Sequence, residues 1–218
     1  DEFKFSDLEN IYMATVIGLR DYVSKNNFPG VILGLSGGID SAFCAAVAVD
    51  ALGKDKVEAY MLPSAYTSEN STIDAEDCAN RLEINLETIS ISDTFLSLEE
   101  SLKTSFEGLP NDITEENLQS RIRGTILMAI SNKKGKMLIT TGNKSEVSVG
   151  YSTLYGDMNG GFNPIKDIYK TELYALANWR NNNLPNNILL DKKDVIPSSI
   201  ISKEPTAELR DNQKDSDS

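Results

Sequence analysis

Residues 31–42 read Val31-Ile32-Leu33-Gly34-Leu35-Ser36-Gly37-Gly38-Ile39-Asp40-Ser41-Ala42, and the rest of the chain can be interpreted outward from them. A short apolar run ends in Ser-Gly-Gly-x-Asp-Ser, and an alanine-rich apolar stretch follows at once. This pattern predicts a buried strand over 31–35 that turns sharply into a helix over 41–52, and Gly53 ends that helix.

The turn between this strand and helix has the composition of a phosphate site. Gly37 and Gly38 let the main chain approach a bulky anion, and the helix N-terminus adds partial positive charge. The hydroxyls of Ser36 and Ser41 are donors for its oxygens. Asp40 would repel a bare phosphate, so we expect it to hold a divalent cation against phosphate oxygens, which implies a magnesium nucleotide. The alternative, a glycine-rich turn without a ligand, is disfavoured because all six positions and their context match.

Strand and helix patterns alternate along the chain. We expect further strands over 57–62, 86–91 and 137–141, and helices over 7–25, 72–82, 93–106, 115–131 and 168–183. The alternation predicts an α/β fold, a doubly wound parallel sheet of Rossmann type with flanking helices, in a single domain over 1–218. Ligands of such sheets bind at the carboxyl ends of the strands near a topological switch, where the Ser36 turn and the turn at Leu62 would fall. The glycine-rich loop 150–161 is long enough to expect a function, and the polar residues 210–218 predict a mobile tail.

Composition excludes several classes of protein. The 218 residues carry 33 acidic and 21 basic side chains, a net charge of −12, and no His. Such a surface disfavours nucleic-acid or anionic-membrane partners, and the lack of His excludes Ser-His-Asp, Cys-His and His-ligated zinc chemistry. The two cysteines, Cys44 and Cys78, are expected as core residues in a reducing compartment. No apolar stretch is long enough to span a bilayer and no signal peptide is visible at the start, so we expect a cytoplasmic protein.

The Ser36–Ser41 turn resembles the pyrophosphate-binding loop of the N-type ATP pyrophosphatases, enzymes that cut ATP between its α and β phosphates and pass AMP to an acceptor. It is not a Walker loop, because the required Gly-Lys-Ser/Thr ending occurs nowhere in the chain.

A second group of candidate residues lies downstream. Glu146, after the strand over 137–141, would face Asp40 and supply a second oxygen ligand to the same metal. Lys144, Lys166 and Lys170 add positive charge to neutralise a triphosphate, although each alone also fits a solvated surface. Asn117 and the Arg121/Arg123 pair are candidates to clamp a second anionic substrate, because the arginine fork binds phosphate or carboxylate bidentately.

Together these segments resemble the NAD synthetases, of adenine nucleotide alpha hydrolase-like fold, over nearly the whole chain. The matching blocks are the Ser36 turn, Met61-Leu62-Pro63-Ser64 with Tyr66-Thr67-Ser68, Glu116–Gly124, Thr141–Glu146, Tyr155-Gly156-Asp157, Lys170-Thr171 and Lys203–Leu209. Leu154 lies where the short ammonia-dependent enzymes tend to carry a substrate-binding lysine, so the chain is most similar to the synthetase domain of glutamine-dependent enzymes.

The resemblance implies a set of site residues. ATP would be held by Ser36, Gly37, Gly38, Asp40, Ser41, Leu62, Thr141, Lys170 and Thr206. Mg²⁺ would be held by Asp40 and Glu146. Deamido-NAD would be held by Arg121, with Asn117 and Asp157 as weaker companions, and catalysis would rest on Asp40, Lys170 and Asp157.

The implied reaction is the amidation of deamido-NAD to NAD through an acyl-adenylate, with release of AMP and pyrophosphate and with ammonia as the nitrogen source. The family implies a homodimer. Glutamine would serve only if a separate or upstream glutaminase supplied the ammonia, since neither cysteine has the setting of that nucleophile. The family also continues beyond residue 218 into a lid, so we expect a fragment or a form without that lid.

Two alternatives remain open. In the first, the chain is another ATP pyrophosphatase with a different acceptor, such as a GMP-synthetase-like or tRNA-modifying enzyme. The acidic charge and the downstream blocks disfavour this alternative. In the second, the chain is a nucleotide-binding fragment without catalysis.

Overall fold

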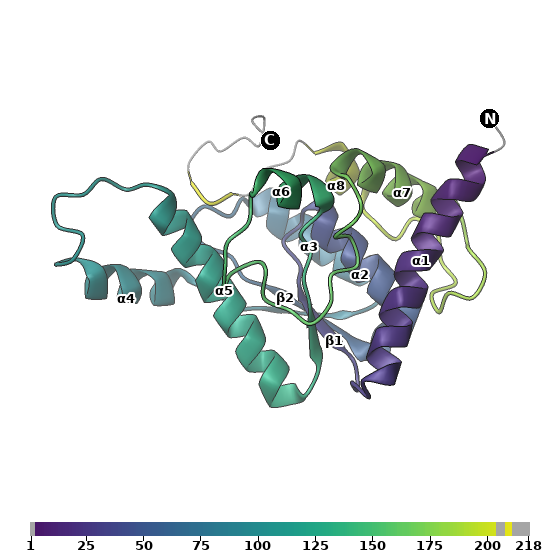
Figure 1. Ribbon diagram of the computed structural model, residues 1–218, viewed down its shortest axis with the longest axis horizontal. Helices are drawn as coiled ribbons and strands as arrows, with labels where there is room; N and C mark the ends of the chain where they lie inside the picture. The colour runs from purple at the N-terminus through teal and green to yellow at the C-terminus, as the bar shows by residue number, and fades with distance from the viewer. Residues whose placement is uncertain (1–2, 204–207, 211–218) are drawn as a thin grey trace.

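The computed structural model describes residues 3–203 and 208–210 and contains a four-stranded, fully parallel sheet (Figure 1). The strands are β1 (Val31–Gly34), β2 (Val57–Met61), β3 (Asn85–Thr88) and β4 (Met137–Ile139), in the order β3-β2-β1-β4. The strands β1, β2 and β3 follow one another toward one edge of the sheet, and β4 then lies on the opposite side of β1. The order of the strands thus reverses between β1 and β4. This is the topological switch that the sequence predicted.

Helices cover both faces of the sheet. They are α1 (Phe3–Lys25), α2 (Ile39–Leu52), α3 (Glu69–Leu82), α4 (Ser92–Leu102), α5 (Ile113–Lys134), α6 (Lys144–Val149), α7 (Lys170–Asn182) and α8 (Ser198–Ser202), with a 3-10 turn at Lys54–Lys56. In Figure 1, α4 and α5 lie on one side of the strands, and α1, α2 and α7 lie on the other.

Alternation along the strands divides the apolar side chains between these two layers. Ile32, Tyr60 and Leu138 pack with side chains of α5, such as Leu127. Their neighbours in each strand, including Leu33, belong to the larger core that α1, α2, α3 and α7 share. All residues of α2 except Asp40 are buried, which explains its alanine-rich composition. The sequence-predicted doubly wound fold is confirmed.

A buried ion pair joins α2 to its neighbours at the end remote from the Ser36 turn. Asp50 accepts hydrogen bonds from Arg180 Nε at 2.7 Å and from the Tyr12 hydroxyl at 2.6 Å. Arg180 has no exposed surface and also donates to the carbonyls of Asn183, Lys192 and Leu190. This cluster ties α1, α2 and α7 together.

The expected elements differ from the structure mainly at their ends. The expected helix over 93–106 stops at Leu102, and the expected strand over 86–91 is β3 at Asn85–Thr88. Short α6 was not predicted, because six residues show no helical periodicity. Cys44 and Cys78 are buried and free, as expected. Of the expected tail, only Arg210 lies within the described residues. Across the described ranges, none of the helices has both the length and the apolar composition of a membrane span.

Candidate functional site

A cavity of about 650 Å³ opens at the carboxyl ends of β1, β2 and β4, bounded by α5, the loop 150–161 and the start of α7. It brings together most of the residues expected to form the site, namely Ser36, Gly38, Asp40, Ser41, Leu62, Thr141, Glu146, Asp157 and Lys170. Gly37, Asn117 and Arg121 do not line it, and Thr206 lies outside the described residues.

The Ser36 turn is fixed by its own serines. Ser41 Oγ accepts a hydrogen bond from the Ser36 amide at 3.1 Å and donates to the Gly38 carbonyl at 3.1 Å. Gly37 has a φ of +82°, and a Cβ there would lie 2.3 Å from the Ser71 carbonyl of α3. Glycine is required at this position for both reasons. Gly38, the N-cap of α2, offers no side-chain acceptor, so the first amides of the helix remain available to an anion.

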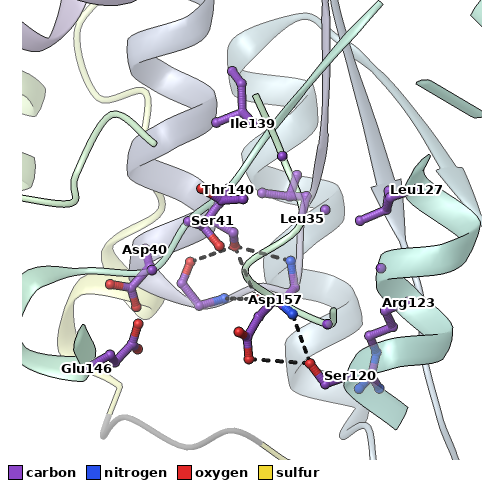
Figure 2. A pocket seen from close by; sticks show the side chains of 18 of the residues that line it. Leu35, Asp40, Ser41, Ser120, Arg123, Leu127, Ile139, Thr140, Glu146 and Asp157 are labelled. Carbon is purple, nitrogen blue, oxygen red and sulfur yellow. Dashed lines mark hydrogen bonds between the residues drawn. The ribbon is translucent and has the colours of Figure 1, made fainter. Parts of the chain in front are cut away.

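Two carboxylates meet on one side of the cavity. Asp40 lies in the first turn of α2 and Glu146 in the first turn of α6, and Figure 2 shows their carboxyl groups pointing toward one another. Burial and the Asp40 charge raise the pKa of Glu146 to about 7. The pair is a set of oxygen donors of the kind that holds a divalent cation.

Asn143, which is fully buried, connects these carboxylates. Its side-chain amide donates to Asp40 Oδ1 at 2.8 Å. Its Oδ1 accepts from the main-chain amide of Glu146 at 3.0 Å, and its main-chain amide donates to Glu146 Oε2 at 3.0 Å. Sequence reasoning gave Asn143 no role. The signal was present as Asn-x-x-Glu, the pattern of a capping box, directly after an expected strand.

Lys170 supplies a cation to the carboxylates. Its ammonium donates to Asp40 Oδ2, and its amide donates to Ser145 Oγ at 3.1 Å, which holds the start of α7 against α6. Burial lowers the pKa of Lys170, but Asp40 and Glu146 outweigh it and the pKa rises. Of the other expected lysines, Lys166 lines the cavity, whereas Lys144 does not and lies 4.4 Å from the centre of the Tyr169 ring.

Of the residues expected to bind the acceptor, Asn117 and Arg121 bond to the loop 150–161 and Asp157 belongs to it. Asn117 Oδ1 accepts from the Thr153 hydroxyl at 2.8 Å, and Arg121 Nε donates to the Leu154 carbonyl at 3.1 Å. Asp157 accepts from the Thr153 amide at 2.9 Å and from Ser120 Oγ at 3.3 Å (Figure 2). Loss of hydration outweighs these bonds, so the pKa of Asp157 is raised.

Arg123 lies on the cavity side of α5, unlike Arg121. Its Nε donates to the Leu62 carbonyl at the end of β2, at 2.9 Å. Burial lowers the pKa of Arg123 to about 10, so the guanidinium stays charged at neutral pH.

A further contact closes the cavity beside α3. Glu208 accepts hydrogen bonds from the hydroxyls of Ser68 and Ser71, both at 2.8 Å, and Lys203 Nζ donates to Ser71 Oγ at 2.6 Å. The Leu209 carbonyl accepts from Gln119 Nε2 at 2.9 Å, so this segment spans from α3 to α5.

Known proteins resemble this chain over most of its length. The family model described as NAD synthase matches residues 11–218. The glutamine-dependent NAD(+) synthetase of Rhodobacter capsulatus is 53% identical over 212 residues, which cover 97% of this chain and 38% of that protein. The chain spans 35% to 38% of the length of the first curated relatives that it matches.

Solved structures share the fold. The glutamine-dependent NAD+ synthetase from Acinetobacter baumannii, in complex with ADP, aligns with a TM-score of 0.84 and 49% identity, over 90% of this chain and 36% of that one. The NH3-dependent NAD synthetase from Campylobacter jejuni, in complex with the nitrate ion, aligns with a TM-score of 0.73 and 32% identity, over 80% of this chain and 73% of that one.

Proposed function

Because the chain belongs to the NAD synthase family, we propose that it carries the site for ATP-dependent amidation of deamido-NAD to NAD. The observation that carries this proposal is the meeting of Asp40, Glu146 and Lys170 beside the Ser36 turn, at the switch point of a parallel sheet. This arrangement suits a nucleotide triphosphate whose pyrophosphate must leave.

ATP would bind with its phosphates on the Ser36 turn. The uncapped amides of α2 and the Lys170 ammonium would neutralise phosphate oxygens. The full set proposed for ATP is Ser36, Gly37, Gly38, Asp40, Ser41, Leu62, Thr141 and Lys170, together with Thr206 outside the described residues. Gly37 would act through the shape of the turn, since it packs against Ser71.

Asp40 and Glu146 fit Mg²⁺. Both supply oxygen ligands, and Glu146 is a buried carboxyl beside the charge of Asp40, which together raise its pKa to about 7. Among residues 3–203 and 208–210, no group of three His, Cys, Asp or Glu side chains forms a metal cluster. Two carboxylates suffice for Mg²⁺, which usually completes its shell with substrate phosphates and waters. When bound, Mg²⁺ would neutralise charge on the triphosphate and the departing pyrophosphate.

The proposed reaction has two steps. The nicotinate carboxylate of deamido-NAD attacks the α phosphorus of ATP and pyrophosphate leaves; ammonia then displaces AMP from the acyl-adenylate. Lys170 and the α2 amides would stabilise the leaving pyrophosphate. Asp157 would accept the proton that ammonia loses, and burial raises its pKa, which makes it a stronger base than a solvated aspartate. Asn117 and Arg121 would hold the dinucleotide beside the loop 150–161.

We propose ammonia as the direct nitrogen source, with glutamine used only through a separate or upstream glutaminase. A homodimer is proposed from the family, with the dinucleotide near the subunit interface. We also propose the cytoplasm as its location, where Cys44 and Cys78 stay reduced.

One observation favours an alternative acceptor. Arg121 and Asn117 are proposed for deamido-NAD. Arg121 donates to the loop 150–161 and Asn117 accepts from it, and neither residue lines the cavity. An ATP pyrophosphatase with another acceptor, or a nucleotide-binding fragment without turnover, would also have this cavity.

The test is formation of AMP, pyrophosphate and NAD from ATP, Mg²⁺, deamido-NAD and ammonium, with a parallel reaction in which glutamine replaces ammonium. We expect NAD with ammonium only. Nicotinate mononucleotide in place of deamido-NAD tests the acceptor. ATP binding without NAD in any reaction would contradict the proposed activity, and lack of ATP binding would contradict the site itself.

A further inference from the structure

We propose that Arg123, rather than forming an acceptor clamp with Arg121, contacts bound ATP at its α-phosphate. This assignment rests on the proposed function, because it takes the Ser36 turn as the site of the ATP phosphates.

The first argument is charge. The one hydrogen bond that Arg123 makes with the described residues is the donation from Nε to the neutral carbonyl of Leu62. No carboxylate of these residues forms an ion pair with it, although Glu208 lies close enough to raise its pKa. Glu208 is instead engaged by Ser68 and Ser71. A partly buried guanidinium whose nearest carboxylate is bonded to other groups is incompletely compensated, so an anionic ligand group would supply the missing partner.

The second argument is direction. An arginine carries five N–H donors, and Nε uses one of them on Leu62. Among the described residues, Gln119 Oε1 is the one buried side-chain nitrogen or oxygen without a partner. The Nη atoms of Arg123 have no hydrogen bond within the described residues and are not among such buried atoms, so they face open space. The open space beside Arg123 is the cavity that it lines. In Figure 2, Arg123 lies along α5, on the opposite side of the view from Asp40 and Glu146.

The third argument is position along the sheet. The Leu35 amide donates to the Tyr60 carbonyl at 2.9 Å, so the ends of β1 and β2 are paired. Ser36 follows Leu35 directly, and Leu62 comes two residues after Tyr60, directly after the end of β2, so both lie at the carboxyl ends of neighbouring strands. An ATP with its outer phosphates on the Ser36 turn and its nucleoside at Leu62 would place its α-phosphate between them, within the reach of the side chain anchored on Leu62.

The fourth argument is rigidity. Ile122 is buried against Leu62 and Ile91, and a Cβ on Gly124 would lie 2.7 Å from the Gly156 carbonyl. Arg123 is thus held between two tightly packed neighbours on α5. Because residues two apart on a helix point in different directions, Arg121 meets the loop while Arg123 meets the cavity.

Titration calorimetry of AMP and adenosine tests the contact. AMP carries the α-phosphate and adenosine does not. We expect R123M to weaken AMP binding about 10- to 100-fold, as loss of a charged hydrogen bond does, and to leave adenosine binding within about twofold. R123K, which retains the charge without the fork, should recover part of the AMP affinity. Equal loss for both ligands, or no loss for AMP, would overturn the proposal.

Steady-state kinetics with R121M as the matched arginine variant provides the second test. R123M should raise the KM for ATP more than the KM for deamido-NAD, and R121M should do the reverse. If R123M raises only the KM for deamido-NAD, Arg123 belongs to the acceptor site and the proposal is wrong. If the unmodified protein makes no NAD, the proposed function fails, and the AMP and adenosine titrations still decide the role of Arg123.

Discussion

Asn143 donates its side-chain amide to Asp40 over 2.8 Å and caps the helix that carries Glu146, so one buried residue sets the relation between the two carboxylates. Burial, and after it the charge of Asp40, raise the pKa of Glu146 to about 7. Without Asn143, the pair would lose both its spacing and its one neutral donor.

Replacing Asn143 separates these two roles. N143A removes the cap and the Asp40 contact, and should cost about 2 kcal/mol of unfolding free energy. N143S retains a capping oxygen but is too short for Asp40, so it should cost about half as much. Urea unfolding measures both. Equal destabilisation by the two variants would show that the cap contributes nothing.

Removing the charge of Asp40 should stop catalysis without unfolding the protein. D40N can still accept a hydrogen bond from Lys170, and it relieves the repulsion at Glu146. We expect pyrophosphate release from Mg-ATP to fall below detection, with an unchanged far-UV circular dichroism spectrum. D93N, an equal change of charge on exposed Asp93 of α4, is the control. Release by D40N at the unmodified rate would exclude Asp40 as the metal ligand.

Gly37 should tolerate no side chain. Alanine there would adopt an unfavourable positive φ and place its Cβ 2.3 Å from the Ser71 carbonyl. We expect G37A to cost about 3 kcal/mol or more and to abolish ATP binding. G135A has a similar φ of +66° with no atom within 4 Å, so it isolates the backbone strain, about 1 to 2 kcal/mol. Similar unfolding energies for the two variants would refute the steric argument.

The buried pair of Asp50 and Arg180 should dominate the stability of the helical layer. R180M leaves the Asp50 carboxylate buried without its ion-pair partner and with the Tyr12 hydroxyl as its remaining hydrogen-bond donor among the described residues. Breaking such a pair costs about 3 to 5 kcal/mol. K54M, which breaks the exposed pair of Lys54 and Glu83, should change the unfolding midpoint in urea far less. A comparable shift of the midpoint for both would contradict this account.

Acid should weaken the fold partly through Glu58. Burial raises the pKa of Glu58, but hydrogen bonds from Lys134, Lys136 and Tyr60 lower it from 4.5 to about 2. A carboxyl with a depressed pKa stabilises the fold above its unfolded value and loses that effect as pH falls through its folded value. E58Q should therefore be less stable than the unmodified protein at neutral pH by about 1 to 2 kcal/mol, allowing for solvent screening.

The difference between E58Q and the unmodified protein should shrink as pH falls from 4.5 toward 2. Urea unfolding across this window measures it. A difference that stays constant with pH would mean that Glu58 acts through packing alone.

The fold was largely predictable from the sequence because its signals are local. The apolar run before Ser36, the alanine-rich helix after it and the alternation that follows determine a parallel sheet, and the structure has that sheet. Element ends were less accurate, and α6 was missed, since a six-residue helix is defined by its cap rather than by periodicity.

The site was predictable where chemistry and position coincide, as at Asp40, Glu146 and Lys170. Arg121 and Arg123 show the limit. The sequence presents them as a pair, but helical phase turns one toward Leu154 and the other toward the cavity. Asp50 and Arg180 lie 130 positions apart, and nothing local in the chain indicates that they meet.

The same spacing of 130 recurs between Asp40 and Lys170. The helices α2 and α7 are thus parallel and in matched register, joined by one ion pair at the cavity and by another ten residues, about 15 Å, further along. A phosphate that draws Lys170 away from Asp40 breaks only the first of these. The second would still hold α7 against α2, so the loss of the Lys170 pair to a bound phosphate would leave the two helices joined.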